Sequence, residues 1–596
     1  MSPSDNLGNR ITYINNITMK QFKYIFLLIF SAFILTNCSE EGLLEETDLD
    51  QIDTEKVYSD VELTRRVLID LYSRMRDIAF NNAAGSSSSS GSFSRLEDMG
   101  TTNSMLDNVT DDGGGMAGKS KALPVVNRMV TGGLSPTTNF LAYTNPWNFY
   151  YRAIRNANQF LANVDRSPLA DEEKQSAKAE ARFLRALYYH EMMRWFGALV
   201  ITTDVLDPFS FSTTKREDME TTIRFIVDEF DAVGQPGVLK DSWDDANYGR
   251  ATRGAALAYK ARTLLYGASS LYKKNGSTVT WQEAADAAKD VIDLNTYGLY
   301  YDATDVAKSY TRLFNERVNN ETILQYLRPD DNDLYNCFPT VDGWNVNKEV
   351  GTIPTQQLID SYDMLNGTEP ITGYNGDAFS PIINPASGYD EQNPYANRDP
   401  RLSQTILHDR ATWPRVNDVV NKMMDLSKDE NWLSGYYLVK YLDDRIDHLK
   451  SGKTSMNFQM MRYAEVLLNY AEAINEAADN GSNRQLAVVQ LNAIRARAGI
   501  TGTLDAANFT QSQLRERIRK ERRVELCFEE HRFFDIRRWE IAMDVLNKPA
   551  LGIEKENGLY VRKKIEDRIF NTRMYFMPIP NSDVNNCPLI YQNEGY

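Results

Sequence analysis

The sequence is poor in cysteine and histidine. Its 596 residues include four of each, and the cysteines are Cys38, Cys337, Cys527 and Cys587. The cysteines form no CxxC pair, and none stands at a Cys/His spacing that would bind zinc or suggest a disulfide framework. The histidines lie in no metal-ligand pattern either. We therefore predict no metal site.

Positive charge is also in deficit. The chain has 66 Lys plus Arg against 82 Asp plus Glu, which gives a formal net charge of -16 and a pI near 5.0. A protein that holds a nucleic-acid backbone presents a basic surface, and no basic patch stands out here. We therefore predict no nucleic-acid partner.

The signature motifs of catalysis are missing too. His190 and Glu191 begin an HExx string, but Arg194 stands where a zinc protease has its second histidine. The run GGGMAG at residues 113–118 matches GxGxxG, yet no strand pattern precedes it, as a dinucleotide site requires. No GxSxG, P-loop or complete EF-hand loop occurs. We predict no catalytic residue and no cofactor, although a carboxylate pair formed only in space, as in glycoside hydrolases, stays open.

A short apolar run near the N-terminus has the features of an export signal. Met19 is followed by Lys20, Lys23 and the 11 apolar-rich residues 25–35, too few to span a bilayer. The run ends at Leu-Thr-Asn-Cys, which resembles a lipobox with Cys38 as the acylated residue. We predict a signal region at 1–37 with the true start at Met19, and lipidation of Cys38. An ordinary signal peptide or a short membrane-buried helix is the alternative.

Helical periodicity dominates much of the remaining chain. Apolar residues recur every three or four positions in segments that follow one another as pairs. Three segments, at 180–197, 253–270 and 461–476, share small residues at tight-packing positions with Tyr or Leu three or four later. This pattern is typical of a tetratricopeptide-like helical repeat. The expected helical segments are 147–165, 172–196, 222–233, 253–272, 280–294 and two helices within 460–499.

Residues 309–459 have a different pattern, with Pro, Gly, Asn and Asp between isolated aromatics. We predict a large loop-rich insertion with little regular structure. Residues 92–146 also lack periodicity and predict a long loop. The expected organisation is a tether at 38–56 and a single mainly α domain at 57–596, with scaffold helices at about 57–308 and 460–545.

Charged side chains are dense between residues 514 and 539. Glu521, Arg522, Arg523 and Glu525 belong to a run in which opposite charges recur three or four positions apart, so that they meet on a helix surface. Such a cluster could be imagined as catalytic, but helical spacing explains it fully. We interpret it as a paired, partly buried structural network.

Several strings resemble motifs of the SusD/RagB family, the surface lipoproteins that capture nutrients for the outer membrane of Bacteroidetes. The two most diagnostic are RYAEVLLNYAEAINE (462–476) and ERRVELCFEEHRFFDIRRW (521–539). Further matches are RALYYHEMMRWFGALVITTD (185–204), NPYANRDPRL (393–402) and YFMPIPNSDVNNCP (575–588). The matches follow the family's order from about residue 38 to the C-terminus. The acidic Ser-Glu-Glu after Cys38 is similar to the signal for export to the cell surface.

The resemblance implies a lipid-anchored outer-membrane protein that captures an extracellular nutrient. An oligosaccharide is the expected ligand, and a SusC-like TonB-dependent transporter is the expected partner. A peptide-capturing, RagB-like role is an alternative from the same class. A surface glycoside hydrolase is the alternative from another class.

Candidate ligand residues follow from the chemistry of glycan recognition. Aromatic faces stack on sugar rings, and Asn, Asp, Gln or Arg side chains bond the hydroxyls; the chain has 32 Tyr and 8 Trp. Loop aromatics beside amides are therefore the best candidates, and the segment VDGWNVN has a turn signal that would put its indole at a loop tip. The predicted ligand residues are Trp344, Asn345, Asp342, Tyr335, Trp243, Trp413, Trp432, Asn103 and Asp107.

Overall fold

The structure is a computed structural model that describes residues 54–75, 106–114, 128–137, 146–206, 212–327, 352–376, 379–416, 419–428, 433–447 and 458–596. The chain divides into two compact units, residues 1–60 and 61–596. In the first unit the structure describes helix α2 (Thr54–Tyr58). All other described elements belong to the second unit. The predictions that lie outside the described residues concern Cys38, Asn103, Tyr335, Asp342, Trp344, Asn345 and Trp432.

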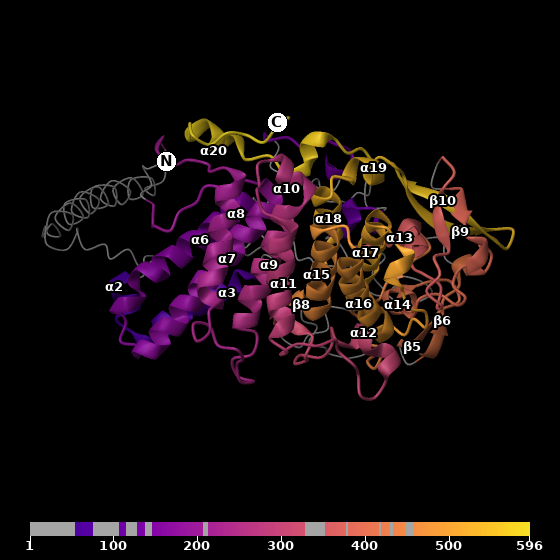
Figure 1. Cartoon of the computed structure of the whole chain (residues 1–596), viewed down its shortest axis with the longest axis horizontal. Coiled ribbons are helices and arrows are strands. Elements are labelled where there is room, and N and C mark those ends of the chain that lie inside the picture. The colour runs from indigo at the N-terminus through magenta and orange to yellow at the C-terminus, as the bar shows by residue number, and fades with distance from the viewer. Residues whose placement is uncertain are drawn as a thin grey trace, which may run out of the picture. The chain divides into compact units, whose positions relative to one another are not determined.

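A row of packed helices forms the scaffold of the second unit (Figure 1). Helix α6 packs on α7, α7 on α8, and α8 on α9; the row continues through α11 and α15 to α16 and α17. Helix α3 packs on α6 and α7. The helices are α3 (Val61–Ser73), α6 (Pro146–Asn163), α7 (Asp171–Phe196), α8 (Met219–Gly234), α9 (Arg253–Ala268), α10 (Ser270–Lys274), α11 (Trp281–Asp293), α15 (Tyr463–Ala477), α16 (Gly481–Arg497), α17 (Gln511–Glu525) and α18 (Arg532–Arg538).

Local sequence explains where these helices begin and how closely they pack. Thr280 opens α11 with a capping box to Glu283, and Thr510 opens α17 in the same way with Gln513. In α9 the small residues are buried, which lets neighbouring backbones approach. From Ala177 onward α7 is buried on nearly all sides, as expected of a helix with neighbours all around it. No helix among the described residues is long and apolar enough to cross a membrane.

The predicted fold class, a mainly α scaffold of helix pairs, is confirmed. The expected pairs α6/α7, α8/α9 and α15/α16 each pack together. One contact was not anticipated: α11 packs on α15, which follows it in the chain only after the loop-rich insertion. The insertion therefore leaves and re-enters the scaffold between two helices that lie side by side (Figure 1).

The insertion contains short elements, in agreement with its predicted character. Its described strands form two-stranded antiparallel ladders: β2 with β3, β4 with β7, and β5 with β6. Strand β1 pairs with β8, which leads directly into α15. The elements are α12 (Ser309–Arg312), β1 (Thr322–Tyr326), α13 (Gln356–Ser361), β2 (Ile371–Tyr374), β3 (Pro381–Ile383), α14 (Pro400–Thr405), β4 (Ile406–Leu407), β5 (Thr412–Val416), β6 (Val419–Met423), β7 (Tyr437–Leu438) and β8 (Phe458–Arg462).

A hairpin near the C-terminus was missed by the sequence analysis. Strands β9 (Ala550–Glu556) and β10 (Leu559–Glu566) pair around Asn557 and Gly558, both of which have positive φ, 52° and 85°. Asn-Gly is the preferred pair for a tight turn that needs left-handed backbone at both positions. The Asn-Gly dipeptide alone therefore predicts a tight turn at this position. The hairpin lies between the short helices α19 (Ala542–Leu546) and α20 (Asn581–Asn586).

The predicted charge network is confirmed: Glu521, Arg522 and Glu525 are buried, and Arg523 is partly exposed. Glu525, at the end of α17, is 0% exposed. It forms ion pairs at 2.8 Å with Arg401 of α14 and at 2.8 Å with Arg462 of β8, and a third with Arg497 of α16. One carboxylate thus joins the insertion, the β1/β8 ladder and the C-terminal helices.

Candidate functional site

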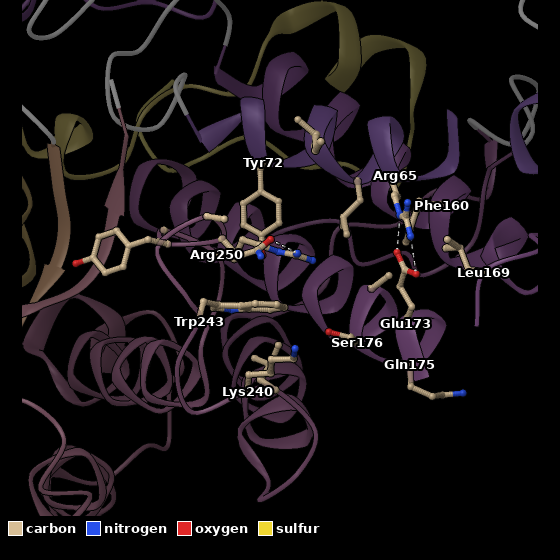
Figure 2. Close-up of a pocket in the computed structure, with 18 of the residues that line it drawn as sticks. Arg65, Tyr72, Phe160, Leu169, Glu173, Gln175, Ser176, Lys240, Trp243 and Arg250 are labelled. Carbon is tan, nitrogen blue, oxygen red and sulfur yellow. Dashed lines mark hydrogen bonds and ion pairs between the residues drawn. The ribbon is translucent and has the colours of Figure 1, made fainter. Parts of the chain in front are cut away.

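A groove of about 1050 Å³ lies at the α3 end of the scaffold. One wall is the face of α3 from Thr64 to Ser73 with Met75 just after it, and another is the segment 237–250 that joins α8 to α9. The start of α7 and the end of β1 complete the lining. Its volume is at the upper end of the range for small-molecule sites. Figure 2 shows 18 of the residues that line it.

Trp243, a predicted ligand residue, lies in the wall of this groove. Its indole Nε1 donates a 2.9 Å hydrogen bond to the carbonyl oxygen of Ala251. The guanidinium of Arg250 lies 4.0 Å from the ring centroid and the ammonium of Lys240 lies 4.4 Å from it. Figure 2 shows these two cations on opposite faces of the indole. The ring is therefore fixed in plane by one hydrogen bond and covered on both sides.

The Arg250 side of the ring is rigidly supported. Arg250 donates two hydrogen bonds, 2.7 and 2.6 Å long, to the carboxylate of Glu180, which is 0% exposed. The Tyr72 hydroxyl donates to the same carboxylate at 2.7 Å and accepts from the Ala251 N–H at 2.9 Å. Burial, and then the Glu180 charge, raises the pKa of Tyr72 well above its usual value, so the hydroxyl stays a donor. Bidentate pairing of this kind fixes orientation as well as charge.

The groove has no charge bias. Arg65, Lys240 and Arg250 balance Glu172, Glu173 and Asp241 among its lining residues. Arg65 of α3 and Glu173 of α7 form a two-bond ion pair, 2.7 and 3.0 Å, that Figure 2 shows across the groove from Trp243. A neutral ligand is therefore favoured over a strongly charged one.

A second feature, which we call the anchor, consists of residues 106–114 and 352–355. The two segments lie side by side: Gly113 forms a β-bridge with Pro354, and the Gly114 N–H donates to the Ile353 carbonyl at 2.9 Å. The Thr355 N–H donates to the Asp112 carbonyl at 3.0 Å. The anchor begins with the 3₁₀-helix η1 (Leu106–Val109), which packs on α18.

Arginines from the C-terminal motif hold the anchor in place. Arg523 donates to Asp112 at 2.6 Å, and Arg532 donates two 2.8 Å bonds to Asp111. Asp107 is different: it is 1% exposed, and neither of its carboxylate oxygens has a hydrogen-bond partner among the residues that the structure describes. Burial, followed by the nearby Glu530 and Asp112 charges, raises the pKa of Asp107 well above its usual value. These surroundings favour the neutral form of the Asp107 carboxyl.

Two segments outside the described residues each follow a groove residue and precede the anchor, and they carry five of the other predicted ligand residues. Met75 and Leu327, which line the groove, precede residues 76–105 and 328–351. The described chain resumes after both segments in the anchor, at 106 and 352. Asn103 belongs to the first segment, and the second carries Tyr335, Asp342, Trp344 and Asn345.

Two candidate residues are not placed as we expected. Asp107 is enclosed in the anchor, and Trp413, in β5, is 6% exposed. Burial of this degree disfavours ligand contact for either side chain, and both remain predictions. Sequence reasoning also missed Arg250, Glu180 and Tyr72, which orient Trp243. Arg250 and Glu180 are 70 residues apart, and no local pattern signals such a contact.

Comparisons with known proteins agree with one another. The family described as "SusD family" matches residues 310–596, and the family described as "Starch-binding associating with outer membrane" matches residues 93–265. SusD-like protein P25 of Formosa agariphila is 24% identical over 593 residues, covering 96% of this chain and 98% of its own. A SusD-like protein of Bacteroides fragilis superimposes with a TM-score of 0.73 at 25% identity, covering 92% and 99% of the two chains. A laminarin-binding SusD-like protein superimposes with a TM-score of 0.57 at 22% identity, covering 90% and 100%.

Proposed function

The chain belongs to the SusD family, and from this premise we propose that it captures an extracellular oligosaccharide and delivers it to a SusC-like TonB-dependent transporter. The names of its relatives support the ligand class. One matching family is described as starch-binding and associated with the outer membrane, and one structural neighbour binds laminarin. The expected location is the cell surface, with Cys38 as the lipid anchor.

The observation that carries this proposal is the neutral groove with a fixed indole in its wall. Glycan recognition needs an aromatic face and nearby groups that bond hydroxyls, and Trp243 lies in one lining with Gln175, Ser176 and Asn247. The described residues Met75 and Leu327, which precede the two segments with five further candidate residues, both line this groove. These features support a ligand-binding role for the groove lining.

We propose that the protein binds its ligand without hydrolysing it. A glycoside hydrolase needs a carboxylic acid with a raised pKa facing a carboxylate. In the groove, hydrogen bonds from Arg65 lower the pKa of Glu173, so this carboxyl stays ionised. The Oδ1 atom of Asp241 lies 3.7 Å from Nη1 of Arg253. These pairings favour a structural role for both carboxylates.

A glycan and peptide array tests the proposal directly. The soluble form beginning at Ser39 is applied to neutral, acidic and amino-sugar oligosaccharides and to peptides. We expect binding to oligosaccharides, with no release of reducing ends on prolonged incubation. Binding to peptides alone would establish the RagB-like alternative, and release of reducing ends would establish the hydrolase.

Lipidation is tested separately. Cys38→Ala should abolish incorporation of labelled fatty acid and move the protein out of the outer-membrane fraction, because the thiol is the predicted acylation site. Cys587→Ala, which changes a partly exposed thiol at the other end of the chain, is the matched control and should leave both properties unchanged. Labelling that persists in Cys38→Ala would contradict the lipobox interpretation.

A further inference from the structure

The two faces of Trp243 are covered in very different ways. Arg250 is fixed by Glu180 on one face, whereas Lys240 on the other face is exposed. The Lys240 ammonium has no ion pair or side-chain hydrogen bond to a described residue, and its contact there is with the indole. One face of the indole is therefore covered by a side chain that is held in place, and the other by a flexible side chain that can move away.

We propose that the Lys240 face of Trp243 is a sugar-stacking site, and that Lys240 is a displaceable cover that the ligand must push aside. This inference rests on the proposed function, since it names a site for the oligosaccharide. The Arg250, Glu180 and Tyr72 cluster keeps the indole in place before the ligand arrives. An aromatic side chain that is already ordered loses little conformational entropy on binding.

The ligand class follows from the surface. The groove lining has equal numbers of basic and acidic side chains, and the whole chain carries a net charge of -16, which disfavours anionic glycans. The C2, C3 and C4 hydroxyls of glucopyranose are equatorial, so the ring C–H groups form flat apolar faces that match an indole. The site therefore fits a neutral gluco-oligosaccharide, with one ring on Trp243 and neighbouring rings along the groove towards Gln175 and Ser176.

If Lys240 covers the ring, removal of this groove side chain should improve binding rather than weaken it. The cation–π contact between Lys240 and Trp243 competes with sugar stacking on the same face. Its loss should therefore strengthen sugar binding roughly two- to fivefold. We expect this gain for Lys240→Ala, measured by calorimetry with maltohexaose and laminarihexaose. Lys289→Ala removes an exposed lysine from α11, outside the groove lining, and is the matched control for net charge.

Trp243→Ala should weaken binding of the same sugars roughly tenfold or more, the scale of truncating a binding hot spot. Trp243→Phe should retain part of the affinity, since a smaller ring still offers a face. Melting curves of each variant check that the fold persists. A chemical readout complements the affinities: saturation with sugar should increase acylation of Lys240 by an amine-reactive reagent, because the ammonium leaves the ring.

The possible results distinguish an error in the proposed site from an error in the proposed function. If the oligosaccharides bind the wild-type chain but Trp243→Phe binds as tightly and Lys240 labelling does not change, the site is wrong while the proposed function stands. If Lys240→Ala weakens binding, Lys240 is a ligand contact rather than a cover. Failure of both glucans to bind the wild-type chain overturns the ligand class, and failure of every array glycan overturns the proposed function as well.

Discussion

Two arginine–carboxylate clusters in this molecule use the same chemistry for different ends. Around Glu525, three arginines from separate elements meet one carboxylate that is 0% exposed. Around Glu180, one arginine meets a carboxylate that is equally buried, but the Arg250 side chain keeps 31% of its surface exposed. The first cluster holds helices and strands together, and the second holds an indole at the edge of solvent.

The difference between the two clusters lies in what the arginine touches on its far side. The arginines at Glu525 contact further buried groups, for example Glu529 and Glu321, so each charge is compensated inside the protein. The far side of Arg250 is an aromatic ring that faces a groove. Burial of the pair alone therefore does not distinguish a structural cluster from one that serves recognition.

The largest expected effect comes from breaking the first cluster. Glu525→Ala should lower the free energy of unfolding by about 3 to 5 kcal/mol, because it leaves buried arginines uncompensated. Burial alone would raise the pKa of Glu525, but Arg497, Arg462 and Arg401 outweigh it and hold the pKa below its usual value. The stabilisation is therefore present at neutral pH and is lost as the pH falls. Chemical denaturation measures the change.

Glu516→Ala is the matched control for that variant. Glu516 lies on the same helix, α17, with a side chain that is 68% exposed and paired only with Arg519 among described residues. Its loss should leave the denaturation midpoint unchanged. Equal effects of the two substitutions would contradict a structural role specific to Glu525.

Asp107 sharpens the comparison, because it is a buried carboxyl that forms no ion pair with an arginine of the described chain. Its raised pKa means that the folded protein binds the proton more tightly than the unfolded chain does. Its contribution to stability is full below the unfolded pKa and is lost as the pH rises towards the folded pKa. Asp107→Asn should remove this dependence, so its stability relative to the wild type should grow by up to about 1.4 kcal/mol per pH unit across that window. Glu530, Asp112 and Lys440 face Asp107 and should be left unchanged.

Denaturation at a series of pH values measures the effect of Asp107→Asn. Asp244→Asn is the control, since hydrogen bonds from Asn247 lower the pKa of that exposed carboxyl. Its stability relative to the wild type should not grow with pH. A flat difference for Asp107→Asn as well would show that the pKa of Asp107 is not raised in the folded protein.

The sequence predicted the scaffold well because helices leave a local signature. Periodicity indicated α7, α9 and α15, and the i, i+4 charges of α17 indicated a paired network. The packing of α11 on α15 has no local signature, because it depends on contacts between segments separated by the insertion. The Asn-Gly turn of the β9/β10 hairpin had a signature that was overlooked.

The candidate site was harder to predict than the fold. Residue type and turn signals singled out both Trp243 and Trp413, and packing separates them: the first lines a groove and the second is buried in β5. A tryptophan in a turn-rich segment is compatible with either outcome. The side chains that support Trp243 are Glu180 of α7 and Tyr72 of α3. Both are far from Trp243 in the sequence, so no local pattern predicts their contacts.

Trp344 extends the comparison to a residue whose role rests on its sequence context. The Asp342-Gly343 turn signal would put its indole at a loop tip, with Asn345 beside it as a partner for hydroxyls. Trp344→Ala should weaken ligand binding by roughly 1 to 3 kcal/mol while stability stays nearly unchanged. Trp413→Ala is the opposite case and should lower stability by about 3 to 5 kcal/mol, as expected for a buried aromatic. Calorimetry and melting curves on both variants test the contrast, and unfolding of Trp344→Ala would make Trp344 a packing residue.

The smallest effect should come from the exposed counterpart of the Glu525 cluster. Arg65 joins α3 to Glu173 of α7 with bond lengths as short as those around Glu525, but the two side chains are 46% and 38% exposed. Water and salt screen such a pair, and ordering two long side chains offsets much of the attraction. Arg65→Ala should therefore leave the melting temperature within experimental error at physiological salt, although the same Arg-to-Ala change at Arg462 should destabilise the protein strongly. A large loss of stability in Arg65→Ala would mean that geometry, rather than exposure, decides what an arginine–carboxylate pair contributes in this protein.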